Sequence, residues 1–339
     1  MRSFSRHIIH LFILLLLGLC ISCSERHRPD KDGAICVKPS LAGDYKDTKA
    51  YIFEGTALPS ANDDEDFFFK VDAYLGEDLF FTSNVKHLYI YNDQDQVDEW
   101  RFHDGTGWKD YYYPQKGTSI DMFGYIPRGY VNVSKAKPLS FTVNMPYDAQ
   151  TDLAEFMYAY APGQSANNAG PVELVFQHPF TAIRFVVKQS HRNLKINRIG
   201  FQNLKCTGTC SVSSDKTATW NLENLQTMTI PVNKIVPDDI NFGGPIGDTY
   251  LVIPQEFTTG ENGLKLYIDY NWDNNDGNDQ NDHYTPSILL SEIHADGGSW
   301  KAGYIYTYAM NLGDSAEEIR FDVTVEPWDL TYEYEYELE

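Results

Sequence analysis

Cys23 is the residue whose position points most directly to chemistry. It follows Ser22 and an apolar run from Leu11 to Leu19, and two arginines precede that run. The run is far shorter than the ~20 residues that a membrane-spanning helix needs, so it is typical of a secretory signal. Bacterial lipoprotein signals end at a cysteine that is acylated. We therefore expect residues 1–22 to be a lipoprotein signal peptide and Cys23 to be lipidated, the alternative being an ordinary signal peptide with an incidental cysteine.

Two further cysteines, Cys206 and Cys210, are close enough in sequence to react with each other. They flank Thr207-Gly208-Thr209, which we interpret as a turn. An oxidising compartment would allow a short disulfide between them, and the alternative is a pair of free thiols. We expect no metal site, because no second Cys or His pair has ligand spacing.

The loop of residues 273–282 is almost wholly Asn, Asp and Gly, and its oxygen atoms are of the kind that Ca²⁺ binds. Counted from Asp273, however, the glycine comes one place early for a helix-loop-helix site, and the twelfth position is Tyr284 rather than an acid. We favour a solvated connection, and calcium binding is the minor alternative.

The sequence contains none of the common catalytic patterns. It has no His-Glu-x-x-His, no Gly-x-Ser-x-Gly and no glycine-rich phosphate loop, and we expect neither an enzyme nor a cofactor. We expect His178, before Pro179, to pack or cap a strand end rather than act as a base. With 27 Lys and Arg against 48 Asp and Glu, the net charge of −21 repels nucleic acid.

The composition predicts strands rather than helices. Aromatic residues make up 14% of the chain, and several segments alternate between apolar and polar residues. The clearest of these are residues 86–91, 182–188, 264–270 and 319–325. Short strands separated by Gly, Pro, Asn and Asp favour an all-β fold of antiparallel sandwiches. We expect one short helix near Ala149, Leu153, Phe156 and Met157.

A domain boundary is predicted between residues 145 and 170. Strand-like sequence ends at Val143, and the flexible stretch from Pro162 to Pro171 precedes the next strand. We expect an N-terminal β-sandwich domain over residues 23–150 and a C-terminal one over 151–339.

Several segments, in this order and spacing, resemble the fimbrillin family, which comprises type V pilins and related surface lipoproteins of Gram-negative anaerobes. In the C-terminal half they are Leu174–Phe185, Trp220-Asn221-Leu222, Leu251–Gln255, Trp300–Tyr308 and Val323–Asp329. Weaker matches in the N-terminal half are Tyr111–Pro114 and Ile120–Pro127.

The resemblance implies two β-sandwich domains with transthyretin-like topology. It also implies a subunit or anchor of a fimbrium, held at the outer membrane by its lipid. The expected partners are other fimbrial subunits in a homo- or hetero-polymer, together with host or bacterial surface glycans or proteins as adhesion targets.

The C-terminal residues 330–338 are the candidate assembly segment. They alternate strictly, so that one face of a strand would carry Leu330, Tyr332, Tyr334, Tyr336 and Leu338. The resemblance implies that this strand is donated to a groove of the next subunit, as in type V pilins. The alternative is that it completes a sheet of its own chain.

In family stalk subunits an N-terminal strand is removed after an arginine. Here Arg26 and Arg28 lie just past the lipid site, and no arginine follows before Arg101. Lys46 and Lys49 read as a solvated turn. This pattern favours an anchor or an uncleaved relative.

A surface glycan-binding lipoprotein is the alternative function. Trp100 and Trp108 lie on either side of Asp104-Gly105-Thr106-Gly107, where exposed indole rings would stack on sugar rings. The same tryptophans are also compatible with a place in the core beside a turn.

Overall fold

The structure is a computed structural model and describes residues 33–41, 58, 67–91, 96–115, 117–146, 154–168, 170–190, 193–237, 243–272, 283–294, 298–312 and 319–328. Within these ranges nearly all regular structure is strand, and the single helix, α2 (Leu290–Ile293), is one turn long. The prediction of an all-β fold is confirmed. None of the helical structure in these ranges is long and apolar enough to span a bilayer.

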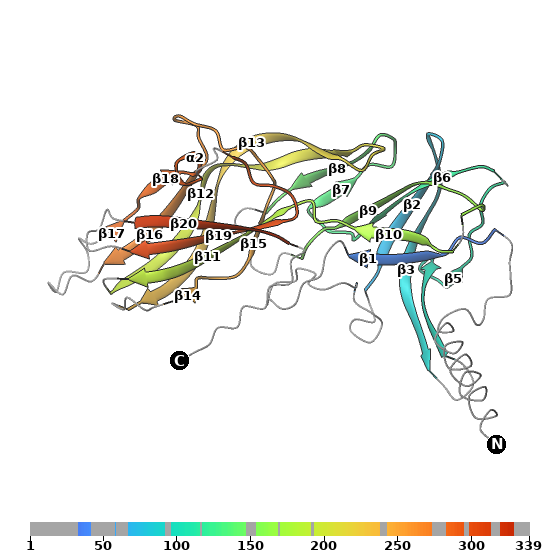
Figure 1. Cartoon of the computed structure of the whole chain (residues 1–339), viewed down its shortest axis with the longest axis horizontal. Coiled ribbons are helices and arrows are strands. Elements are labelled where there is room, and N and C mark those ends of the chain that lie inside the picture. The colour runs from blue at the N-terminus through green and yellow to red at the C-terminus, as the bar shows by residue number, and fades with distance from the viewer. Residues whose placement is uncertain are drawn as a thin grey trace, which may run out of the picture.

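The N-terminal lobe combines a six-stranded antiparallel sheet with a short parallel pair of strands (Figure 1). In spatial order the six strands are β5 (Trp108–Lys109), β4 (Gln96–His103), β3 (Asp78–Tyr91), β2 (Phe69–Leu75), β6 (Ile120–Tyr125) and β9 (Tyr158–Gln164). The parallel pair consists of β1 (Val37–Leu41) and β10 (Val172–Phe176).

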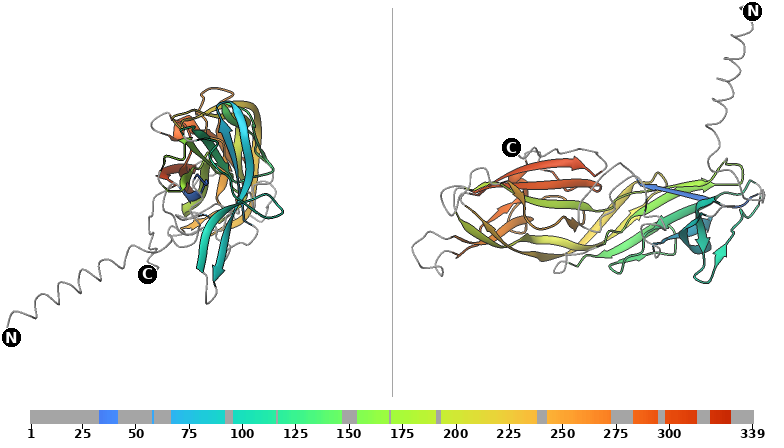
Figure 2. Two further views of the ribbon diagram at one scale, coloured as in Figure 1. Left: turned by 90° about the vertical axis from the view of Figure 1, so that its right-hand side faces the viewer. Right: turned by 90° about the horizontal axis from the view of Figure 1, so that it is seen from below.

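The C-terminal lobe contains a seven-stranded and a five-stranded sheet among the described residues. The first has the order β17 (His283–Tyr284), β16 (Lys265–Trp272), β12 (Leu194–Val212), β8 (Leu139–Asn144) and β7 (Val131–Val133), with β13 (Ala218–Val236) on β12 and β18 (Ser287–Leu289) on β16. The second has the order β14 (Gly244–Pro245), β11 (Thr181–Ser190), β19 (Tyr304–Leu312) and β20 (Ile319–Pro327), with β15 (Tyr250–Val252) on β11. Figure 2 shows the two lobes end to end in an elongated molecule.

The segments that alternate in sequence form strands, as predicted. Residues 86–91 lie in β3, 182–188 in β11, 319–325 in β20, and 264–270 in β16 apart from their first residue. In β11, Ile183, Phe185 and Val187 are buried, whereas Lys188 on the opposite face is exposed. This is the period of two that a strand with one face against a core requires.

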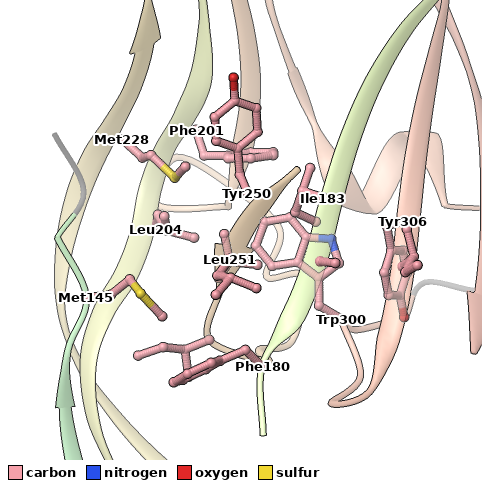
Figure 3. Packing of buried hydrophobic residues seen from close by; sticks show 14 of the residues in the cluster. Met145, Phe180, Ile183, Phe201, Leu204, Met228, Tyr250, Leu251, Trp300 and Tyr306 are labelled. Carbon is pink, nitrogen blue, oxygen red and sulfur yellow. The ribbon is translucent and has the colours of Figure 1, made fainter. Parts of the chain in front are cut away.

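The buried hydrophobic residues form two clusters, a smaller one within the N-terminal lobe and a larger one that fills the C-terminal lobe and extends onto the six-stranded sheet through Tyr74, Phe123 and Tyr158. In the N-terminal lobe, Phe69, Val71, Met122, Leu174 and Phe176 are fully buried. In the C-terminal lobe, Figure 3 shows side chains of β11, β12, β13, β15 and β19 pointing into one interior. Burial of each such side chain stabilises the fold by about 1.5–3 kcal/mol, and the larger cluster also packs the two lobes against each other.

The chain passes between the lobes three times, which differs from the single boundary that we predicted. It leaves the N-terminal lobe after β6, returns after β8 and leaves again after β10. Thus β7 and β8 precede residue 150 yet pair in the sheet of β12, while β9 and β10 follow it yet lie in the N-terminal lobe. A loop composition marks a break between strands but does not say which sheet the next strand joins.

The predicted helix near residue 153 is not formed where the structure describes it. Ala149 and Leu153 lie outside the described residues. Phe156 and Met157 are buried and non-helical, and they lead directly into β9. Their apolar spacing therefore reflects burial in the core rather than one face of a helix.

Two lysines between β7 and β8 tie the C-terminal lobe to the N-terminal sheet. The Lys135 Nζ lies 2.7 and 2.5 Å from the two carboxylate oxygens of the fully buried Asp72. It also donates to the Tyr125 hydroxyl at 2.9 Å. Lys137 forms an ion pair with Asp121 of β6. The β7–β8 connection is therefore held on β2 and β6 by two ion pairs.

Candidate functional site

β1 is a short edge strand that pairs with β10 and packs on the core of the N-terminal lobe. We call the space that it occupies beside β10 the β1 slot. Among the described residues its only partner strand is β10. Ile35, Val37 and Leu41 are only 3, 5 and 7% exposed, so alternate side chains point into the core. Pro39 lacks an N–H group, which an edge strand tolerates. Removal of β1 would leave the β10 backbone unpaired on that side and open a groove lined by apolar side chains.

The floor of this slot is closely packed. Leu174 and Phe176 of β10 are fully buried, and the Phe176 ring meets the Phe69 ring edge to face at 5.1 Å between centroids. Gly124 of β6 lies beneath them, and a Cβ there would be 3.2 Å from Phe176 Cζ. Glycine at this position therefore allows β10 to lie against the six-stranded sheet, which fixes the position of the slot.

Towards the other end of the chain, the last described residue is Trp328, directly after β20. Its side chain is only 2% exposed, and its backbone N–H donates to the Gly303 carbonyl at 2.7 Å. The candidate donor residues Leu330, Tyr332, Tyr334, Tyr336 and Leu338 lie outside the described residues, as does Cys23.

Trp328 packs on a buried Glu–His pair where the chain crosses between the lobes. Its indole stacks on the His178 ring with centroids 4.4 Å apart and planes at 8°. His178 Nδ1 lies 2.6 Å from Glu155 Oε1. Glu155 is fully buried, and its Oε2 has no hydrogen-bond partner in the described part of the protein. His178 thus packs at a strand end, as expected.

The backbone on both sides of Glu155 is fixed by two half-buried side chains from the β6–β7 connection, Arg128 and Tyr130. The Arg128 Nε donates to the Glu155 carbonyl at 2.7 Å. The Tyr130 hydroxyl donates to the Ala154 carbonyl at 2.8 Å and accepts from the Phe156 N–H at 3.1 Å. Burial lowers the pKa of Arg128 and raises that of Tyr130. The carboxylate position is therefore set by packing rather than by a mobile loop.

The two candidate disulfide cysteines are free thiols within one continuous strand. The predicted turn between Cys206 and Cys210 is absent, because residues 206–210 belong to β12. Residues four apart on a strand are separated by roughly 13 Å, whereas a disulfide needs Cα atoms within about 7 Å. Gly208 is there for another reason: a Cβ would lie 2.6 Å from Leu222 Cδ2 of β13.

The two tryptophans of the glycan-binding alternative have different environments. Trp100 is partly buried and packs on Phe69 and His87. Trp108 is 39% exposed, with the Arg101 guanidinium 5.8 Å from its ring. The turn before it is held by Asp104, whose Oδ1 accepts from two backbone N–H groups. These contacts describe a stable turn rather than an open stacking surface.

The possible calcium loop, residues 273–282, lies outside the described residues. Beside it, the buried Asp269 is paired with Arg198 and lies 2.8 Å from His283 Nε2. Within the described ranges, no group of His, Cys, Asp and Glu has the arrangement of a metal site.

Neither the β1 slot nor the Glu155–His178–Trp328 cluster is evident from the sequence. The alternation of Ile35, Val37 and Leu41 was the available signal for β1, but Pro39 interrupts it. Glu155 and His178 are far apart in the sequence, and they meet only because the chain runs back through β9 and β10 between them. No local pattern in the sequence therefore links the two residues.

Comparison with solved structures gives the same fold at low sequence identity. A protein assigned to cell adhesion from Bacteroides uniformis matches with a TM-score of 0.52 and 15% identity, over 89% of this chain and 100% of the other. A fimbrial protein from Bacteroides vulgatus matches with a TM-score of 0.53 and 13% identity, over 87% and 99%.

The sequence profile of the fimbrillin-like family matches residues 49–328. A comparison with curated proteins gives no match. The profile spans both lobes, from before β2 to Trp328, and its family is one of fimbrial and adhesion proteins rather than enzymes. The chain therefore belongs to the fimbrillin-like family.

Proposed function

We propose that this chain is an acylated fimbrial anchor that donates residues 330–338 to the sheet of a neighbouring subunit. Its lipid on Cys23 would hold it at the outer membrane. The family match supports a role in a fimbrium. The observation that supports donation most strongly is that a strictly alternating segment directly follows Trp328, where the described fold ends.

The β1 slot indicates what an acceptor for such a strand looks like. β1 presents Val37 and Leu41 to the core, Ile35 just before it is buried on the same period of two, and β1 pairs with one strand only among the described residues. Residues 330–338 have the same period with larger side chains. An added strand gains affinity from its main-chain hydrogen bonds and register from its alternate side chains.

The sequence between β1 and β2 supports the role of anchor. No arginine lies between Arg28 and Arg101, so maturation after an arginine has no site that would release β1. A chain that keeps β1 has its own slot filled, and it can donate a strand without accepting one. Such a subunit belongs at one end of a fibre, and acylation at Cys23 would place that end at the membrane.

Truncation after Trp328 tests the donation directly. We expect the shortened chain to lose binding to fimbrial subunits while its melting curve stays that of the full chain. A collapsed fold would contradict the proposal, because it would mean that residues 330–338 complete a sheet of their own chain.

A nicked variant tests whether the slot accepts this strand. A sequence-specific protease site is inserted within residues 42–57, so that cleavage frees β1 from the rest of the chain. A fluorescent peptide of residues 329–339 should then bind the nicked chain and release β1. The uncut chain and a scrambled peptide are the controls, and equal binding to cut and uncut chains would contradict the mechanism.

A further inference from the structure

We propose that Glu155, His178 and Trp328 form a latch that positions the start of the C-terminal strand at the junction of the two lobes. The inference rests on the proposed donation of residues 330–338 and adds the residues that aim the strand. Glu155 and His178 are positioning residues, since neither belongs to the donated segment.

The latch has three layers, each fixed by the next. The backbone carbonyl of Glu155 is held by the Arg128 side chain. The fully buried Glu155 carboxylate places its Oε1 2.6 Å from His178 Nδ1. His178 in turn offers the flat face on which Trp328 stacks at 4.4 Å. The backbone N–H of Trp328 donates to the Gly303 carbonyl. The final described residue is thus held by both its ring and its backbone.

The location of the latch explains why its position matters. Arg128, Glu155 and His178 lie on the three connections by which the chain crosses between the lobes. The stack of Trp328 on His178 therefore places the residue after β20 at the junction of the two lobes. A strand that begins at a fixed point explores less space before it meets an acceptor, which lowers the entropy cost of binding.

The Glu155 carboxylate has a role in the packing of His178. A fully buried carboxylate with one oxygen lacking a hydrogen-bond partner in the described structure is costly, and the nearby Arg128 guanidinium attracts its charge. The contact of Glu155 with His178 fixes the orientation of the imidazole, and this orientation makes the parallel stack with Trp328 possible.

The test compares two variants by fluorine NMR of the full chain labelled with 5-fluorotryptophan. The Trp328 signal is assigned with Trp328→Phe. Glu155→Gln/His178→Ala removes the aromatic face together with the Glu155 charge, so that no buried carboxylate loses its partner, and we expect the Trp328 signal to move to its position in a free peptide of residues 326–339. Glu155→Gln/His178→Phe makes the same change at Glu155 but keeps an aromatic face, and the signal should stay near that of the natural chain.

The same variants are then tested for binding to the nicked acceptor. Loss of a ring stack corresponds to roughly a two- to tenfold change in an equilibrium constant. We expect Glu155→Gln/His178→Ala to associate with the nicked acceptor more slowly by about that factor. An unmoved fluorine signal in Glu155→Gln/His178→Ala would overturn the latch. So would a moved signal with unchanged association, or a Glu155→Gln/His178→Phe variant as impaired as Glu155→Gln/His178→Ala. Failure of the proposed function is recognised separately, because the natural chain itself would then not bind the acceptor.

Discussion

Replacement of Lys135 by Met tests the ion pair that ties the two lobes together. Asp72 is fully buried, and its carboxylate is held by Lys135 and by the Thr82 hydroxyl, which donates at 2.7 Å. Lys135→Met leaves this buried charge without its cation, which typically costs about 3–5 kcal/mol of unfolding free energy. Asp72→Asn should cost less, roughly 1–3 kcal/mol, because the Lys135 side chain is 48% exposed and regains water.

The double variant Asp72→Asn/Lys135→Met completes the cycle. We expect it to be about as stable as Asp72→Asn, since Lys135 then has no charge to neutralise. Equilibrium urea unfolding, followed by fluorescence and circular dichroism together, gives the four free energies and tests for a single transition. A Lys135→Met variant no less stable than Asp72→Asn, or strictly additive losses, would refute the reasoning.

Three further predictions concern acid stability, thiol reactivity and strand spacing. Burial opposes ionisation of Asp121, but its contacts with Lys137 and other donors outweigh this and lower its pKa. The stability that ionised Asp121 contributes is therefore fully present above the pKa of the unfolded chain, about 3.9, and is lost as the pH falls through the lower pKa of the folded chain. The difference in urea midpoint between the natural chain and Asp121→Asn should accordingly shrink below about pH 4. Burial raises the pKa of Cys206 and Cys210 to about 12, so a thiol reagent at pH 8 should label them only after urea is added. Gly200→Ala places a Cβ 2.0 Å from a backbone oxygen of β13 and should lower the thermal melting temperature through a loss of about 1–3 kcal/mol or more.

The strands of this fold could be predicted because burial of one face imposes a visible period. The segment 182–188 alternates in sequence, and Ile183, Phe185 and Val187 are buried in β11. The sheet to which a strand belongs leaves no such trace. Residues 131–144 lie in the C-terminal lobe because β8 pairs with β12, a contact far away in sequence.

The candidate sites show the same limit. The Gly208 between Cys206 and Cys210 suggested a turn, but its role is to let β13 approach β12 closely. A glycine in a strand and a glycine in a turn look alike in a single sequence. The stack of Trp328 on His178 joins the residue after β20 to the β10–β11 connection, and only the folded structure brings these segments together.

A photo-crosslinker in place of Tyr334 tests the central claim most directly. The chain is expressed in cells with this substitution, irradiated and analysed by gel electrophoresis and mass spectrometry. Donation predicts a crosslink to a second polypeptide, at a groove like the one that β1 fills here. Crosslinks found only within the same chain would contradict the account.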